Sequence, residues 1–74
     1  MSDRESRIPG MGLRIRTLRT DRGMTQSELA GKIGAAPSVI GNYEAELRAP
    51  SYENLIKLSE VFGVSTDYLL GYKK

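Results

Sequence analysis

The sequence contains neither cysteine nor histidine among its 74 residues. Without cysteine the chain has no disulfide, no thiolate nucleophile and no cysteine-bound metal, and without histidine it lacks the usual zinc ligand and general base. There is also no clustered pair of carboxylates, so an enzyme is disfavoured and neither a metal nor another cofactor is expected. The side chains that remain suit binding better than catalysis.

Long apolar runs are absent as well. No segment approaches the roughly 20 apolar residues of a membrane span, and the N-terminus has no apolar signal region. We therefore expect a cytoplasmic protein without membrane contact. A chain of 74 residues is large enough for one small hydrophobic core and too small for a second, which indicates a single domain.

An excess of one charge is missing too. Eleven basic side chains stand against nine acidic ones, and the net charge is only +2. Bulk charge is therefore weak evidence for a nucleic-acid partner, and the distribution of the charges matters more.

Residues 24–45 have the pattern of two short helices joined by a tight turn. Thr25 and Glu28 have the spacing of a reciprocal cap, in which each side chain accepts a hydrogen bond from the other residue's backbone N–H. Apolar residues then recur at helical spacing up to Ile33, and Gly34 falls where a left-handed residue ends a helix. The sequence predicts a sharp turn after the first helix of the pair.

The second helix of the pair is predicted to begin at Pro37, because proline's fixed backbone angle suits the first helical position. At about 100° per residue, Ile40, Tyr43 and Glu44 share one side of this helix. The opposite side carries short, uncharged residues: Ser38, Gly41, Asn42 and Ala45. Such a face fits closely against base edges, yet it is equally typical of a solvated face in a small bundle. Periodicity alone does not decide between these interpretations.

The same criteria, applied to the rest of the chain, predict an all-α, compact bundle of five helices over residues 11–74. The helices are expected at about 11–21, 26–33, 37–45, 52–62 and 66–70. Residues 1–10 are polar and lack a hydrophobic period, so we expect a flexible N-terminal arm. Arg4 and Arg7 in this arm either touch DNA phosphates or belong to a solvated tail, and the neighbouring Asp3 and Glu5 favour the tail.

The order of residues decides what periodicity leaves open. The chain resembles the helix-turn-helix of the phage-repressor (Cro-like) family, also called the xenobiotic-response-element type, through residues that each stand in their place: Gln26, Ala30, Gly34 and Ile40. The resemblance extends over roughly residues 11–70, through G-L-R-I-R-T-L-R before the pair and R-A-P-S-Y-E-N-L-I-K-L-S-E-V-F-G-V-S-T-D-Y-L-L after it. Agreement across most of the chain is far more specific than any single motif.

The resemblance implies an ion pair between the first and third helices, at the positions of Arg19 and Glu44. Arg19 follows Leu18 and lies near the apolar stripe of the first helix, where an arginine needs a carboxylate partner. The alternative is two exposed charges.

The resemblance also implies which residues touch double-stranded DNA. Gln26, in the first turn of the second helix, would clamp a phosphate with its side-chain amide and the backbone donors of the helix end. Pro37, Ser38 and Asn42 would read the major groove, with Asn42 against an adenine and Pro37 against a thymine methyl. The rest of this face offers no long side chain, so DNA shape is expected to carry part of the specificity.

The loop after Ala45 departs from the family pattern, which has a glycine and then a polar, often basic segment. Here Glu46 and Leu47 follow, and we expect an acidic side chain near the DNA backbone that weakens a phosphate contact. Arg48 is expected to restore one. The first helix carries four arginines that either supply phosphate contacts or form its solvated side: Arg14, Arg16, Arg19 and Arg22.

These inferences predict a sequence-specific DNA-binding transcriptional regulator, a repressor that occupies an inverted-repeat operator as a homodimer. Tyr68, Leu70 and Tyr72 follow the core positions of the fifth helix, which in this family supplies the subunit contact; ordinary surface residues of a monomer are the alternative. A different class is an antitoxin or other protein-binding module that covers a partner such as a toxin or an anti-repressor. The end of the chain soon after the fifth helix favours the plain repressor.

Overall fold

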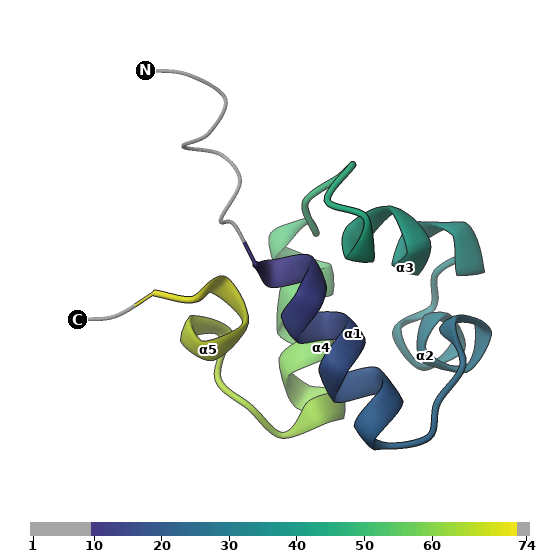
Figure 1. Cartoon of the computed structure of the whole chain (residues 1–74), viewed down its shortest axis with the longest axis horizontal. Coiled ribbons are helices and arrows are strands. Elements are labelled where there is room, and N and C mark those ends of the chain that lie inside the picture. Colours follow the sequence, from purple (N-terminus) through teal and green to yellow (C-terminus); the bar gives the residue numbers. More distant parts are fainter. Residues whose placement is uncertain (1–9, 73–74) are drawn as a thin grey trace.

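The computed structural model describes residues 10–72, and all regular structure in this range is helical. Figure 1 shows how helices α1 to α5 are arranged, and together they enclose one hydrophobic core. Their bounds are Met11–Asp21, Gln26–Ile33, Pro37–Glu44, Tyr52–Phe62 and Thr66–Leu70. The predicted all-α fold is confirmed, and the one difference in bounds is that α3 ends one residue earlier than expected. Residues 1–9 of the arm expected over 1–10, with Arg4 and Arg7, lie outside the described residues.

The start of α2 has the predicted reciprocal cap. The Thr25 hydroxyl accepts from the Glu28 N–H at 3.0 Å, and the Glu28 carboxylate accepts from the Thr25 N–H at 2.8 Å. Gly34 ends the helix in the left-handed region, with φ of 71°. Pro37 then opens α3 after Ala36, which provides no side-chain cap. The turn between the two helices is therefore short, and its shape depends on residues close together in sequence.

The core takes one large, fully buried side chain from each helix: Ile15, Leu29, Ile40, Leu58 and Leu69. Other apolar groups of the predicted inner faces complete it, including Met11, Leu18 and Phe62. Each helix thus buries a stripe that it could not bury alone.

The N-terminal turn of α1 lies directly against the last turn of α3. A β-carbon added to Gly12 would stand 2.4 Å from the Glu44 carbonyl oxygen and 2.7 Å from that of Tyr43. Only glycine allows the two backbones to approach so closely. At its other side α3 is held by Asn54 of α4, whose side-chain amide donates to the Tyr43 hydroxyl at 2.9 Å. Among residues 10–72, no helix is long and apolar enough to cross a membrane.

Candidate nucleic-acid interface

The outer face of α3 is the candidate reading surface. Ile40 and Tyr43 are buried on the inner side, and this places Pro37 and Ser38 in an exposed first turn. Asn42 follows one turn later and is partly exposed. Ser38 and Asn42 therefore lie on one side of a helix whose opposite side is anchored in the core, and Pro37 lies at its exposed N-terminal end.

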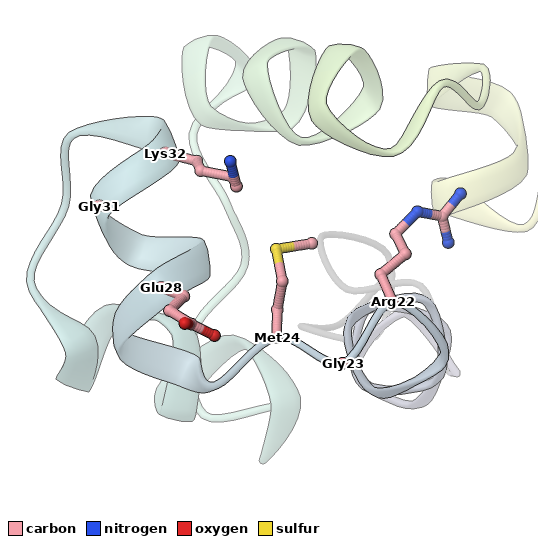
Figure 2. Close-up of a pocket in the computed structure, with 6 residues that line it drawn as sticks. All are labelled: Arg22, Gly23, Met24, Glu28, Gly31 and Lys32. Carbon is pink, nitrogen blue, oxygen red and sulfur yellow. The ribbon is translucent and has the colours of Figure 1, made fainter.

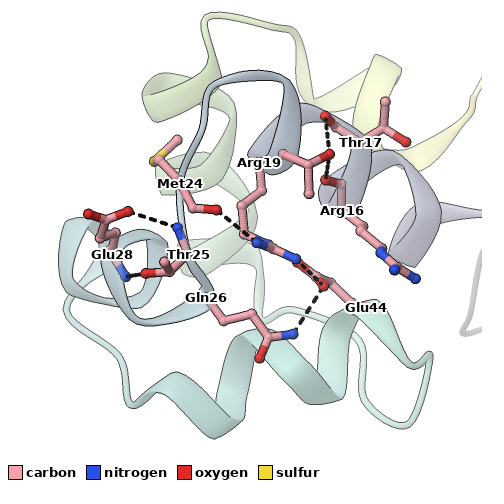
Figure 3. Close-up of polar contacts among 9 residues, drawn as sticks. Arg16, Thr17, Arg19, Met24, Thr25, Gln26, Glu28 and Glu44 are labelled. Atoms are coloured by element: carbon pink, nitrogen blue, oxygen red, sulfur yellow. Dashed lines mark hydrogen bonds and ion pairs between the residues drawn. The ribbon is translucent and has the colours of Figure 1, made fainter.

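Arg19 and Glu44 form the predicted pair, with two contacts between α1 and α3 (Figure 3). Arg19 Nε lies 2.6 Å from Glu44 Oε2, and Arg19 Nη2 donates to Glu44 Oε1 at 3.1 Å. The two side chains are only 12% and 6% exposed. The hydrogen bond with Glu44 raises the pKa of Arg19, burial opposes this, and the charge of Glu44 raises it further. The guanidinium is therefore held in its charged form.

The pair belongs to a larger network that joins three elements. Arg19 Nη1 donates to the Met24 carbonyl oxygen at 2.8 Å, in the turn between α1 and α2. Gln26, at the start of α2, donates its side-chain amide to Glu44 Oε1 at 3.1 Å. The Glu44 carboxylate thus fixes α3 to the two helices before it.

An open pocket of about 360 Å³ lies beside this network. Its lining comes from α1, α2 and α3 with the residue after it: Arg16, Arg19, Gln26, Gly41, Glu44 and Ala45. Figure 3 shows Arg16, Arg19 and Gln26 around Glu44. The pocket places Arg16 and the Gln26 amide beside the Arg19–Glu44 ion pair, at the first turn of α2, where backbone N–H groups favour an anion.

The three arginines of α1 and Arg22, its C-cap, divide between this pocket and contacts with α4 and α5. Arg14 Nε donates to the Leu69 carbonyl oxygen at 3.0 Å, so this side chain ties α1 to α5. Arg22 Nη2 donates to the Phe62 carbonyl oxygen at 2.8 Å, and its guanidinium lies 5.3 Å from the centre of the Phe62 ring. Arg16 was named from the sequence only as one of four arginines of this helix, although its position three residues before Arg19 places both on the same side of the helix.

Glu46 makes a hydrogen bond within the domain. Its Oε2 accepts from the Gly12 N–H at 2.7 Å, at the start of α1, and its expected place near the DNA backbone stays a prediction. Its neighbours Leu47 and Arg48 are exposed. Of the loop residues, Arg48 thus remains available to an outside anion.

The C-terminal face holds the residues predicted for a subunit contact. Tyr68 and Tyr72 are 52% and 59% exposed and line an open pocket of about 360 Å³ together with Arg14, Asp67 and Gly71. Leu70, the third residue predicted there, is partly buried and packs against the core. The exposed part of this face is therefore aromatic.

A further pocket of about 450 Å³ lies at the α1–α2 turn (Figure 2). Figure 2 shows Met24 and Lys32 pointing into it and Arg22 at its edge. Its charged groups are partly engaged already, since Glu28 caps α2 and Arg22 bonds to α4. None of the predicted reading residues lines this pocket.

Helix α3, with its short-chained outer face, follows the capped helix α2 and a glycine turn and lies beside a pocket lined by two arginines, and this arrangement defines a helix-turn-helix domain. The chain belongs to the helix-turn-helix family whose model matches residues 15–69, the Cro-like family that its sequence resembles. Among curated relatives, the HTH-type transcriptional regulator ImmR of Bacillus subtilis is 43% identical over 61 residues. This match covers 82% of the chain and 48% of ImmR. The chain spans about half the length of the first curated relatives it matches.

Solved structures share the fold. The P22 c2 repressor, in complex with a synthetic operator, is 35% identical with a TM-score of 0.81, and the match covers 85% of this chain and 96% of the repressor chain. The N-terminal DNA-binding domain of SinR from Bacillus subtilis is 40% identical with a TM-score of 0.76, covering 82% and 90% of the two chains. SinR also matches in structures with DNA and with the SinI protein.

Proposed function

We propose that this chain binds duplex DNA sequence-specifically and acts as a transcriptional repressor by occupying an operator. The observation that carries the proposal is the outer face of α3, where short polar side chains stand exposed beside a pocket of anion-binding character. The similarity to the P22 c2 repressor with its operator and to SinR with DNA supports the same function.

Asn42, Ser38 and Pro37 are the proposed reading residues. The Asn42 amide has the donor and acceptor that match the major-groove edge of adenine, and Pro37 offers an apolar surface to a thymine methyl. Ser38 accepts or donates a single bond. Because these side chains are short, α3 must lie deep in the groove, and part of the specificity comes from DNA shape.

The pocket beside Glu44 is the proposed phosphate site. Gln26 gives one amide hydrogen to Glu44 and retains a second, which together with the backbone N–H groups at the start of α2 that the Thr25 cap leaves open faces an incoming phosphate. Arg16 adds a positive charge from α1. Arg48 is the corresponding candidate in the loop after α3, where its exposed side chain reaches a second phosphate.

The operator is proposed to be an inverted repeat bound by two copies of the chain. One domain with three short reading side chains makes too few base contacts for the affinity usual at specific sites. Tyr68 and Tyr72 provide exposed aromatic surface for a two-fold contact, with Leu70 at its edge. Two-fold symmetry then requires half-site centres about 10 to 10.5 base pairs apart.

Selection of bound fragments from random duplex DNA tests the function directly. A palindromic motif should be enriched, and its half-site should contain an adenine whose replacement weakens binding. Failure to enrich any motif would contradict sequence-specific binding. The competing function is binding to a protein such as a toxin or an anti-repressor. The match to SinR in its complex with SinI supports this second function. Stable copurification of a second protein, with no enriched DNA, would favour that function.

A further inference from the structure

Among residues 10–72, neither the N-cap position nor the first turn of helix α1 provides a side-chain cap. Its N-cap position is Gly10, with φ of 91°, which makes no side-chain hydrogen bond, and the first turn contains no acidic residue. The first backbone N–H groups of a helix have no partner within it. Glu46, 34 positions further along the chain, supplies one by accepting from the Gly12 N–H.

Glu46 also occupies an unusual backbone position at the end of α3. Its φ of 62° is the one left-handed angle of a non-glycine residue among residues 10–72. The Glu46 N–H donates to the Tyr43 carbonyl at 3.1 Å, and the Leu47 N–H donates to the Asn42 carbonyl at 2.9 Å. These two bonds form a Schellman turn, whose left-handed position normally carries glycine because a β-carbon is disfavoured there.

The start of α1 and the end of α3, which Glu46 joins, are also in direct backbone contact. Gly12 lies against the carbonyl groups of Tyr43 and Glu44, in the last turn of the proposed reading helix. The Asn42 carbonyl accepts from both Leu47 and Arg48, so the turn that carries Glu46 closes directly on a proposed reading residue. A change in this turn therefore moves the backbone of Asn42 and Arg48 together.

We infer that Glu46 is a positioning residue for DNA recognition. Its carboxylate, bonded to the Gly12 N–H, holds the left-handed turn in place and fixes the end of α3 relative to α1. Asn42 and Arg48 are then held in fixed positions relative to each other when they contact the duplex. The inference rests on the proposed function, since it assigns Glu46 a role at the same surface without contact to DNA.

Two substitutions separate the hydrogen bond from the charge and from the backbone conformation. Glu46→Gln keeps an acceptor oxygen and removes the charge, whereas Glu46→Gly removes the acceptor and relieves the left-handed position. Glu46→Asn is a second variant without reach to Gly12, and asparagine tolerates the left-handed angle. Glu60→Gln, on the exposed side of α4, is the matched control for loss of one negative charge.

The first measurement is exchange of the Gly12 amide proton in the free protein. Glu46→Gly and Glu46→Asn should speed this exchange by about tenfold or more, while Glu46→Gln retains most of the protection. The second measurement is binding to a panel of single-base operator variants. Glu46→Gly and Glu46→Asn should lose about tenfold in discrimination at the base pair read by Asn42. Glu46→Gln should keep the base preference of the unsubstituted protein and change the affinity for every sequence by the same factor, because the acceptor for the Gly12 N–H is retained.

If the Gly12 amide proton exchanges at an unchanged rate in both Glu46→Gly and Glu46→Asn, the hydrogen bond between Glu46 and Gly12 does not exist in solution. Faster exchange with an unchanged base preference would reduce Glu46 to a cap of α1 and overturn the positioning role. If the unsubstituted protein discriminates no DNA sequence, the proposed function fails, and the positioning role of Glu46 fails with it. The exchange of the Gly12 amide proton shows separately whether the hydrogen bond with Glu46 exists.

Discussion

Gln26 and Arg19 share one acceptor: both donate to Glu44 Oε1 at 3.1 Å, one from the start of α2 and the other from α1. The proposed phosphate-contacting residue is thus bonded to the carboxylate that anchors the reading helix. Any substitution in this network affects stability and DNA binding together, and the two must be measured separately.

The ion pair gives the first prediction. Arg19→Met should lower the free energy of unfolding by about 3 to 5 kcal/mol, because Glu44 is left charged and buried without its main partner. Replacing both residues by apolar ones of similar size should cost less than this single change. A double-mutant cycle by urea unfolding measures the coupling. Additive effects of the two single changes would show that the pair contributes no interaction energy.

Asn42→Ala tests the reading face. Loss of an amide bonded to a base should weaken binding to the preferred site by about 1 to 3 kcal/mol and relax the preference at one base pair. Gln26→Ala is the comparison, because loss of a phosphate contact should weaken binding to all sequences alike. Both proteins are titrated against single-base operator variants. Equal losses at every position for Asn42→Ala would exclude its role as a reader.

Arg16→Gln tests the phosphate pocket. The logarithm of the association constant falls as the logarithm of the salt concentration rises. Removal of one cation that neutralises a phosphate should make this slope less steep by about one unit and leave base preference unchanged. Lys57→Gln removes an exposed charge from α4, outside the pocket, and serves as the matched control. Binding is measured between low and physiological salt. An identical slope for Arg16→Gln and the control would place Arg16 away from the DNA.

The aromatic face of α5 gives the prediction on assembly. Replacing Tyr68 and Tyr72 by Ser should weaken binding to a two-half-site operator by at least about tenfold and leave single half-sites unaffected, because the subunit contact is lost. Tyr52→Ser removes another exposed tyrosine, 79% exposed on α4, and should change neither value. Inserting five base pairs between the half-sites should abolish cooperative binding by the unsubstituted protein. One protein per fragment at saturation, with no effect of spacing, would rule the dimer out.

Short-range rules account for most of the secondary structure. The cap at Thr25 and Glu28, the left-handed Gly34 and the start of α3 at Pro37 depend on residues within one or two turns, and all are found as predicted. The end of α3 was predicted one residue too late. A helix end depends on which carbonyls the following turn satisfies, and here the turn at Glu46 bonds back to Tyr43 and closes the helix after Glu44.

The sequence by itself determined the five helices and their buried faces, because spacing along a helix decides which residues share a side. The pair of Arg19 and Glu44 came from the resemblance of the sequence to the family. Only the tertiary structure decided the direction of the other long polar side chains. Arg14 and Arg22 bond to α5 and α4, Arg16 joins the pocket, and Glu46 reaches α1 across 34 positions of sequence. The physical reason is that such side chains bond to whichever unpaired backbone group or charge the packing brings within reach, and that group lies on another element.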